Sequence, residues 1–404
     1  MSKKYSLFEV YGIELEYMIV DSHSLKVKSL ADKLLAEVNG KYANNYVNAS
    51  VEWSNELVNH VIELKTHVPV AEPFSMNSAF AENIRFINQL LTKDQAMLLS
   101  TAAHPTMDPF TETCLWEHDD REIYDLYNSI FDCRGHGWSN LQSTHINLPF
   151  KNDKEFGRLH AAVRLVLPLI PALCASSPVL DSKPTGFLDS RLEVYKHNQE
   201  SIPEIAGLII PEALFTHHDY IDGIFKPIKK AIKAFDKEAL LDEHFLNSRG
   251  AIARFDRGSI EIRLVDIQEC VKADLAIVAL MVELIKALVS EGFASYEEQK
   301  KMSHVPLADI LNRMIVSGEN TVIDNRDYLK IFNIDKGDMT ASCVWKYLFT
   351  GLKDSLPREV VPVIEDILDR GSLASRILKA LDKNRSLTEI YQTMAGCLVK
   401  NELF

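Results

Sequence analysis

Polar and hydrophobic residues alternate with a period of two in four short segments of this chain. In GIELEYMIV, Glu14 and Glu16 alternate with Ile13, Leu15 and Tyr17. The same alternation recurs in VIELKT, STHINLPF and SIEIRLVD, where the polar positions are Glu63 and Lys65, His145 and Asn147, and Glu261 and Arg263. Because successive side chains of a strand point to opposite faces, the pattern predicts strands that gather polar side chains on one sheet face.

The rest of the chain predicts strands and helices in separated groups. Strands are expected at about 7–20, 47–53, 58–67, 96–103, 142–149, 250–256 and 259–267. Helices are expected at about 75–92, 153–176, 203–218, 222–235 and 270–291. Such an order, without regular alternation of strand and helix, is typical of the α+β class.

The segment ARFDRGSIEIR predicts a β-hairpin. Asp256, Arg257 and Gly258 would form a three-residue loop, in which Gly258 can take the left-handed conformation. This hairpin would bring Arg254 close to the strand that carries Glu261.

From about residue 294 the strand signals fade, and LADILNRMIV, REVVPVIEDIL and LASRILKALDK have helical spacing. No linker rich in Gly, Ser or Pro precedes this part of the chain. We therefore expect a core over residues 1–293 and a helical C-terminal segment over residues 294–404 that packs on the same domain.

Composition narrows the classes of partner. The chain has 404 residues, a formal net charge of −13 and no long basic run, so we expect no nucleic-acid partner. Six scattered cysteines without a Cys-x-x-Cys pair favour reduced thiols and a cytoplasmic protein. The N-terminal segment reaches Glu9 before any long apolar stretch, and no apolar run reaches the ~20 residues of a membrane-spanning helix. We therefore expect neither a signal peptide nor a membrane partner.

Clustered carboxylates are the main chemical clue. Like charges and burial both disfavour ionised carboxylates unless cations supply the opposite charge. An oxygen-rich set with a single histidine suits Mg²⁺ or Mn²⁺ better than Zn²⁺. The sequence has no G-x-x-x-x-G-K-[ST], G-x-G-x-x-G, G-x-S-x-G or H-E-x-x-H motif, so a bound nucleotide would have to be held through cations on the sheet.

Six segments together resemble a known family. They are GIELEY, IELKT, the His-Pro of STAAHPTMDP, THINLPF, LPLIPALCASSP and RGSIEIRLVD, in that order. Over about residues 8–290 the chain resembles glutamate-cysteine ligase family 2, whose carboxylate-amine ligases share the catalytic fold of glutamine synthetase. The resemblance implies a mainly antiparallel, curved sheet with helices packed on it, within a ligase catalytic core.

The resemblance also implies an activity. In such enzymes Mg²⁺-bound ATP phosphorylates a substrate carboxylate, and an amine then attacks the acyl phosphate to give an amide. Glutamate is the expected acid, the product is of the γ-glutamyl type, and glutamate-cysteine ligase activity in glutathione biosynthesis is the best-known form. The expected partners are therefore small molecules, namely ATP, an amino-acid carboxylate and an amine, and a homo-oligomer is left open.

The resemblance assigns metal ligands position by position. Glu14 and Glu63 match carboxylates that ligate one metal in such enzymes. Glu16, His145 and Glu261 match ligands of the metals that bridge the ATP phosphates. Glu261 is also one of two expected catalytic residues. From the residues alone, His145 could be an ordinary buried histidine, although its alternation with Asn147 favours a ligand.

Further positions complete the expected site. Glu56 falls where related ligases have another acidic metal ligand, and Asn147 matches the polar partner beside the family's histidine. Arg263 matches the arginine that contacts the phosphate and is the second catalytic residue, although it could be a structural partner of a nearby carboxylate. Arg254 and Arg191 are candidate anion clamps, because guanidinium binds oxyanions through paired hydrogen bonds.

One segment departs from the family. In SSPVLDSKPTGFLDSR, Pro184 stands where many members have an acidic residue. Because this loop would approach the substrates, the change leaves the amine acceptor open.

Three other functions remain compatible with the same residues. A guanidino kinase would transfer a phosphoryl group from Mg-ATP on a similar sheet, and a divalent-metal hydrolase would use the carboxylates to hold a bound water. A protein that binds ATP or an amino acid without turnover would tolerate replacement of Arg263.

Overall fold

The computed structural model describes residues 4–404, so the first three residues of the expected core lie outside the described residues. Its centre is an eight-stranded sheet in the order β2-β3-β4-β1-β6-β10-β9, with β5 paired to β1. The strands are β1 (Gly12–Asp21), β2 (Asn45–Asn48), β3 (Val51–Asn55), β4 (Val61–Thr66), β5 (Ala96–Leu99), β6 (Ser143–Pro149), β9 (Ala251–Arg254) and β10 (Ser259–Asp266). All of these pairs are antiparallel. The expected α+β class with a mainly antiparallel sheet is confirmed.

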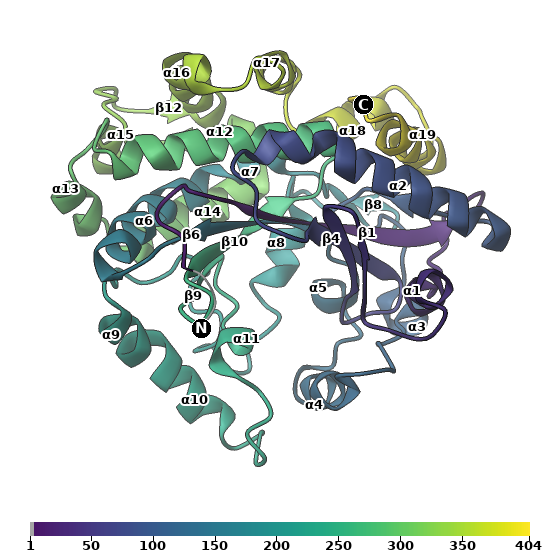
Figure 1. Cartoon of the computed structure of the whole chain (residues 1–404). Coiled ribbons are helices and arrows are strands. Elements are labelled where there is room, and N and C mark those ends of the chain that lie inside the picture. Colours follow the sequence, from purple (N-terminus) through teal and green to yellow (C-terminus); the bar gives the residue numbers. More distant parts are fainter. Residues whose placement is uncertain (1–3) are drawn as a thin grey trace.

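Helices α2 (Asn77–Leu91) and α12 (Val271–Val289) lie along one face of this sheet (Figure 1). The apolar side of β1, including Ile13 and Leu15, shares a core cluster with Phe80 and Ile84 of α2 and with Leu275 of α12. Helix α2 has its buried residues on one side, as an amphipathic helix should. Helix α12 is buried on nearly all sides, because further helices cover it from outside.

The helical C-terminal segment forms this outer layer. Its helices are α13 (Tyr296–Lys301), α14 (His304–Ser317), α15 (Arg326–Ile331), α16 (Ala341–Leu352), α17 (Val360–Arg370), α18 (Leu373–Asp382) and α19 (Leu387–Lys400). Helices α16 and α17 contact α12, and α19 contacts α2 and β5. The three helices expected from spacing in this part of the chain are confirmed. The boundary at residue 293 stays a prediction, and the core runs across it without a break.

The other face of the sheet carries shorter elements on its two sides (Figure 1). On one side are α1 (Ala31–Asn39), α3 (Pro109–Glu112), α4 (Arg121–Phe131) and α5 (His136–Ser139). On the other are α9 (His217–Tyr220), α10 (Lys226–Ile232) and α11 (Glu243–Leu246). The remaining helices are α6 (Asp153–Val166), α7 (Pro171–Cys174) and α8 (Ser190–Tyr195), and two short strand pairs are β7 (Val179–Leu180) with β8 (Lys183–Pro184) and β11 (Val322–Ile323) with β12 (Met339–Thr340).

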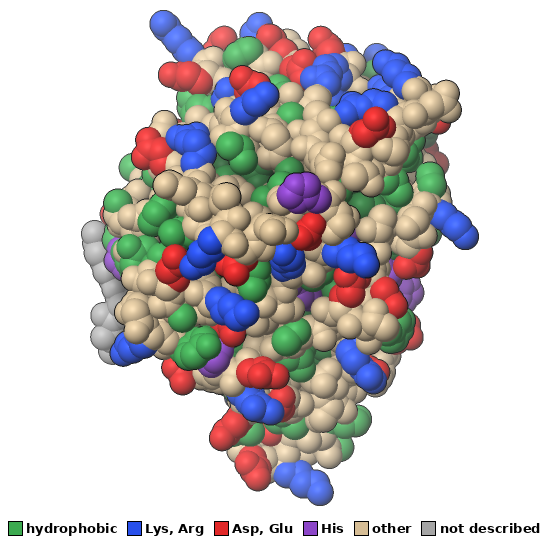
Figure 2. All heavy atoms as spheres, turned by 90° about the vertical axis from the view of Figure 1, so that its right-hand side faces the viewer, with side chains coloured by type: hydrophobic (Ala, Val, Ile, Leu, Met, Phe, Trp, Pro, Cys, Tyr) green, Lys and Arg blue, Asp and Glu red, His purple; other side chains and the backbone are tan. Residues whose placement is uncertain are grey.

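Acidic and basic side chains are interspersed on the molecular face shown in Figure 2, with hydrophobic side chains between them. Within residues 4–404, every helix is too short or too polar to cross a membrane.

Several expected elements were wrong. Residues 203–218 form turns rather than a helix until α9 begins at His217, because Pro203, Gly207 and Pro211 interrupt the apolar pattern. The single strand expected at 47–53 is a hairpin of β2 and β3, which turns at Ala49 with a φ of 56°. The long helix expected at 153–176 is divided into α6 and α7 by a 3-10 turn over Leu167–Leu169. Helix α10 is shorter than the expected 222–235 and follows a π-helical turn over Ile221–Phe225.

Candidate active site

Antiparallel pairing brings the polar residues of the four alternating segments onto one face of the sheet. Residues directly opposite each other on neighbouring strands point to the same face. The pairs on this face include Glu14–Lys65, Glu14–His145, Glu16–Glu63 and Glu261–Asn147. The apolar partners of the alternation lie on the opposite face against α2 and α12.

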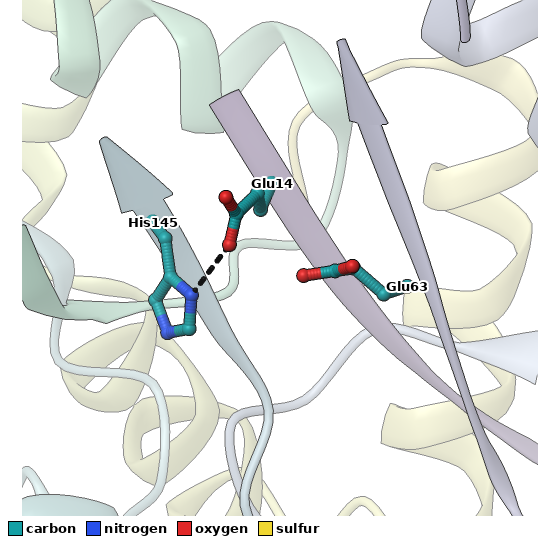
Figure 3. A group of neighbouring side chains, drawn as sticks. All are labelled: Glu14, Glu63 and His145. Atoms are coloured by element: carbon teal, nitrogen blue, oxygen red, sulfur yellow. Dashed lines mark hydrogen bonds and ion pairs between the residues drawn. The ribbon is translucent and has the colours of Figure 1, made fainter. Parts of the chain in front are cut away.

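Glu14 stands at the centre of this polar face (Figure 3). Its Oε2 atom lies 3.1 Å from Nδ1 of His145, and its Oε1 atom accepts a hydrogen bond of 2.9 Å from Asn147. Glu63 points toward it from the neighbouring strand β4 (Figure 3). One ligand atom from each of Glu14, Glu63 and His145 lies within 4.8 Å of the other two, which is close enough for one shared cation.

Glu16 and Glu63 both accept hydrogen bonds from serine residues. The Oε2 atom of Glu16 accepts hydrogen bonds from the backbone N–H of Ser143 at 2.6 Å and from its hydroxyl at 2.9 Å. Glu63 accepts a hydrogen bond from Ser54 and forms an ion pair of 3.0 Å with Lys65. These contacts fix the carboxylates in place before any ligand binds.

Two cavities open on the polar face. The first has a volume of about 230 Å³ and is lined by Glu16, Glu56, His145, Arg191, Arg254, Glu261 and Arg263. Aromatic side chains of Tyr124, Tyr127, Trp138 and Phe245 line the same cavity as an aromatic wall. The second cavity, of about 440 Å³, is lined by Glu14 and Asn147 together with Lys65 and Arg257. Glu63 lines neither cavity.

Two arginines flank Glu261. The Nε atom of Arg263 lies 3.1 Å from Oε1 of Glu261, and Nη1 of Arg254 lies 3.8 Å from Oε2. The expected β9–β10 hairpin is confirmed, with Gly258 at a φ of 73°. Its turn spans residues 255–258, because Arg254 and Ser259 are the last paired residues, and is thus one residue longer than expected.

Arg191 lies in a different environment from the other two arginines. It is 2% exposed and forms an ion pair with Asp266, which is fully buried. Its two terminal nitrogens also donate to the backbone carbonyl of Arg263. The expected role of Arg191 as an anion clamp stays a prediction.

Burial raises the pKa of Glu14, Glu16, Glu56 and Glu63 above that of a free glutamate. Neighbouring carboxylates add to this rise: Glu261 acts on Glu14, and Glu63 acts on Glu16 and Glu56. These four side chains are therefore destabilised in their ionised form, which an added cation would relieve.

Glu261 behaves in the opposite way. Burial alone would raise its pKa, but Arg263, His145 and Arg254 together lower it. Burial lowers the pKa of His145 in spite of the surrounding carboxylates, so its neutral imidazole is available as a ligand. The site thus combines one firmly ionised glutamate with four that lack sufficient positive charge.

Several site residues carried only a weak signal in the sequence. Lys65 and Ser143 share the alternation with Glu63 and His145, so their place on the polar face could be predicted. The aromatic wall could not, because Tyr127 and Phe245 come from helices α4 and α11, which are far apart in the chain and meet at a ring distance of 5.3 Å.

Sequence comparison finds a matching family model and related proteins. The sequence model of glutamate-cysteine ligase family 2 matches residues 10–319. A protein from Archaeoglobus fulgidus, described as uncharacterized, is 30% identical over 97% of this chain and 99% of its own length. A Bradyrhizobium diazoefficiens protein, provisionally described as glutamate-cysteine ligase 2, is 27% identical over 52% of this chain and 45% of its own length.

A solved structure supports the fold. The bifunctional glutathione synthetase of Pasteurella multocida aligns over 98% of this chain with a TM-score of 0.55 and 10% sequence identity. The alignment covers 53% of that larger protein, so the chain spans about half its length.

Proposed function

The chain belongs to glutamate-cysteine ligase family 2, whose members are carboxylate-amine ligases, and we propose that it uses ATP and Mg²⁺ to form an amide bond of the γ-glutamyl type. The observation that carries the proposal is the polar face of the sheet. Five glutamates there, namely Glu14, Glu16, Glu56, Glu63 and Glu261, accompany Lys65, Arg254 and Arg263. Two further arginines at these cavities have carboxylate partners outside this set, because Arg191 pairs with Asp266 and Arg257 pairs with Asp256. This excess of negative charge is suited to divalent cations and, through them, to phosphates.

The reaction proceeds in two steps. An oxygen of the substrate carboxylate attacks the γ-phosphorus of ATP, the bond to the β–γ bridging oxygen breaks, and ADP leaves. The amine nitrogen then attacks the acyl carbon, the phosphate leaves with the electron pair of the broken carbon–oxygen bond, and the nitrogen loses a proton. The products are the amide, ADP and inorganic phosphate.

The donor set fits a hard divalent cation, since it offers carboxylate oxygens and one neutral imidazole. Glu14, Glu63 and His145 would hold one cation, and Glu16, Glu56 and Glu261 would supply ligands for others. Such cations, when bound, would neutralise the phosphate oxygens during transfer.

The remaining residues position the reactants. Arg263 points into the cavity beside Glu261 and would contact the transferred phosphoryl group, because phosphoryl transfer depends on fixed positive charge more than on a nucleophilic side chain. Arg254 borders the same cavity and could stabilise the phosphate or the substrate carboxylate. The aromatic wall would exclude water, which would otherwise hydrolyse an acyl phosphate.

The test is ADP release by the purified protein with Mg-ATP and L-glutamate, scanned against a panel of amines that includes cysteine. Release that requires both glutamate and one amine is expected, with a matching amide identified by mass spectrometry. Formation of a phosphoguanidine would instead indicate a guanidino kinase, and turnover without nucleotide would indicate a hydrolase. ATP binding without turnover, unchanged in Arg263→Ala, would indicate a binding protein.

A further inference from the structure

Strand β10 contains a bulge next to the candidate active site. Ile262 pairs with Ile146 of β6, but the next paired residue, Val265, lies opposite Thr144. Two residues of β10, Arg263 and Leu264, therefore stand opposite a single residue of β6, His145. Bulges of this kind change the direction of a side chain and the twist of the strand.

The bulge changes which residues of β10 face the active site. In a regular strand Glu261, Arg263 and Val265 would share a face. Because the register shifts by one, Asp266 instead pairs with Ser143, whose side chain contacts Glu16 on the polar face. Arg263 and Asp266 are three residues apart, but both thus point to the sheet face that carries the candidate active site.

Gly250 makes room for the bulge. A Cβ atom at Gly250 would lie 2.7 Å from Cδ1 of Leu264, so the Leu264 side chain would have to shift. The Gly250 carbonyl accepts a hydrogen bond of 3.0 Å from the backbone N–H of Arg263. The residue just before β9 therefore holds one side of the bulge.

The other side is held by a buried ion pair. The Nε atom of Arg191 donates to Asp266, and its Nη1 and Nη2 atoms each donate to the carbonyl of Arg263 at 3.3 Å. Arg191 is 2% exposed and Asp266 is 0% exposed. A single guanidinium thus joins the carbonyl at the bulge to the carboxylate three residues later.

Two serines and the N-terminus of helix α8 form further hydrogen bonds around the Arg191–Asp266 ion pair. The Oδ2 atom of Asp266 accepts hydrogen bonds from the backbone of Ser176 at 2.8 Å and from the hydroxyl of Ser177 at 3.1 Å. The same Ser177 hydroxyl accepts from the backbone N–H of Arg191 at 3.0 Å. Asp189 caps the helix α8 on which Arg191 lies. The SSP and DSR segments of the sequence therefore meet at this point.

We infer that Arg191 and Asp266 form a clamp that holds the bulge of β10 and so positions the Arg263 side chain over the cavity. The inference rests on the proposed function of Arg263 in phosphoryl transfer. Arg191 is, in this view, a positioning residue, because its hydrogen-bonding groups are directed to Asp266 and to the protein backbone.

The physical reason is the competing register of the strand. Without the clamp, β10 could pair regularly with β6, which would place Arg263 directly opposite His145 and turn Asp266 to the apolar face. Buried Arg191 opposes this slip, because it would lose its carboxylate partner. The clamp thereby favours the bulged register and a single direction of Arg263.

The test compares Arg191→Lys with Arg376→Lys. Lysine keeps the positive charge but cannot bond both the Asp266 carboxylate and the Arg263 carbonyl as the guanidinium does. The matched control removes the guanidinium of Arg376, which forms a similar buried ion pair with Glu269 but contacts no residue of the cavity. We expect Arg191→Lys to lower kcat at least about tenfold with little change in the KM for ATP, and Arg376→Lys to keep kcat.

A double variant separates positioning from direct contact with substrate. If Arg191 acts through Arg263, Arg191→Lys should cause no further loss of kcat in an Arg263→Ala background. Additive losses, or a rise of KM as the main effect of Arg191→Lys, would overturn the inference in favour of substrate binding by Arg191.

A readout without catalysis keeps the clamp testable if the proposed function fails. Hydrogen exchange of the backbone amides in residues 259–266 should become faster in Arg191→Lys, while the exchange of β4 stays unchanged. If the wild-type protein releases no ADP with any substrate pair, the proposed function fails but this measurement still decides on the clamp. Unchanged exchange in β10 would overturn the clamp whatever the activity.

Discussion

At the scale of single residues, Glu14 links several residues of the candidate site. It faces His145 and Asn147 through its two oxygens and lies close to Glu63. Glu14→Gln keeps the size of the side chain but removes a charge that a cation would need. We expect the variant to fold and to lose metal-dependent ADP release by at least about 100-fold, because replacement of residues that merely support metal ligands already costs about 10–100-fold.

A suitable control for this variant is Glu283→Gln. Glu283 lies on α12, behind the sheet, and forms an ion pair with Lys286. The control should release ADP at the wild-type rate. Full activity in Glu14→Gln, with circular dichroism unchanged in both variants, would show that Glu14 is not a metal ligand.

A second residue-scale prediction concerns His60, which lies outside the site. Burial lowers its pKa to about 4, and Nε2 lies 2.7 Å from the carbonyl of Ser139. The unfolded chain takes up the proton below about pH 6.5, whereas the folded chain does so only near pH 4. The stability contributed by neutral His60 is therefore complete above pH 6.5 and is lost as the pH falls toward 4.

His60→Gln isolates this effect, because the glutamine amide can donate to the same carbonyl but cannot titrate. Between pH 7 and pH 5 the wild-type protein should lose about 2 kcal/mol more free energy of unfolding than the variant. Urea titrations at both pH values measure the difference. Parallel losses in the two proteins would show that His60 does not contribute to acid sensitivity.

Most of the site residues could be predicted because strands have a simple period. Glu14, Glu16, His145, Asn147 and Glu261 follow strict alternation, and pairing then brings them together. The clamp could not be predicted, because the bulge breaks the alternation within RLVD and no local signal marks the extra residue.

At the scale of elements, the β9–β10 hairpin depends on Gly258. Its φ of 73° is unfavourable for other residues, and a Cβ atom would lie 3.0 Å from the carbonyl oxygen of Phe150. Gly40 provides a matched control, since it has a φ of 70° but open space around its missing Cβ. Gly40→Ala should cost about 1 kcal/mol of unfolding free energy, and Gly258→Ala should cost more because the close contact adds to the conformational penalty.

Chemical denaturation of the two variants measures this difference. A larger loss for Gly258→Ala, together with weaker ADP release, is expected because the hairpin also sets the position of Arg254 beside Glu261. Equal losses in the two variants would mean that the hairpin relaxes without cost.

Elements with a clear period were predictable, and those set by turns were not. The expected strands at 142–149 and 259–267 and the helices at 75–92 and 270–291 agree with β6, β10, α2 and α12 within two residues. Residues 203–218 are apolar enough to suggest a helix, but two prolines and a glycine let them bury the same side chains in turns. Tertiary packing, rather than local propensity, determines such a segment.

At the scale of the whole molecule, the helical C-terminal segment packs against the sheet and against the helices that cover it. Ile390 and Tyr391 of α19 share a core cluster with Met18 of β1 and Leu99 of β5. Arg376 of α18 forms its buried ion pair with Glu269, three residues after Asp266. The segment therefore stabilises the strands that carry the site without supplying residues to the two cavities.

The excess of carboxylates should make the stability of the whole molecule depend on divalent cations. The four glutamates with a raised pKa repel one another in the metal-free protein, and cations bind only to the folded arrangement. Mg²⁺ at about 100 times its dissociation constant would add about 2.7 kcal/mol to the free energy of unfolding. Thermal unfolding in EDTA and in excess Mg²⁺, with NaCl added to equal ionic strength, separates binding from charge screening. The melting temperature should rise with Mg²⁺ in the wild-type protein and rise less in Glu14→Gln. Identical melting temperatures with and without Mg²⁺ would contradict a cation site on this sheet.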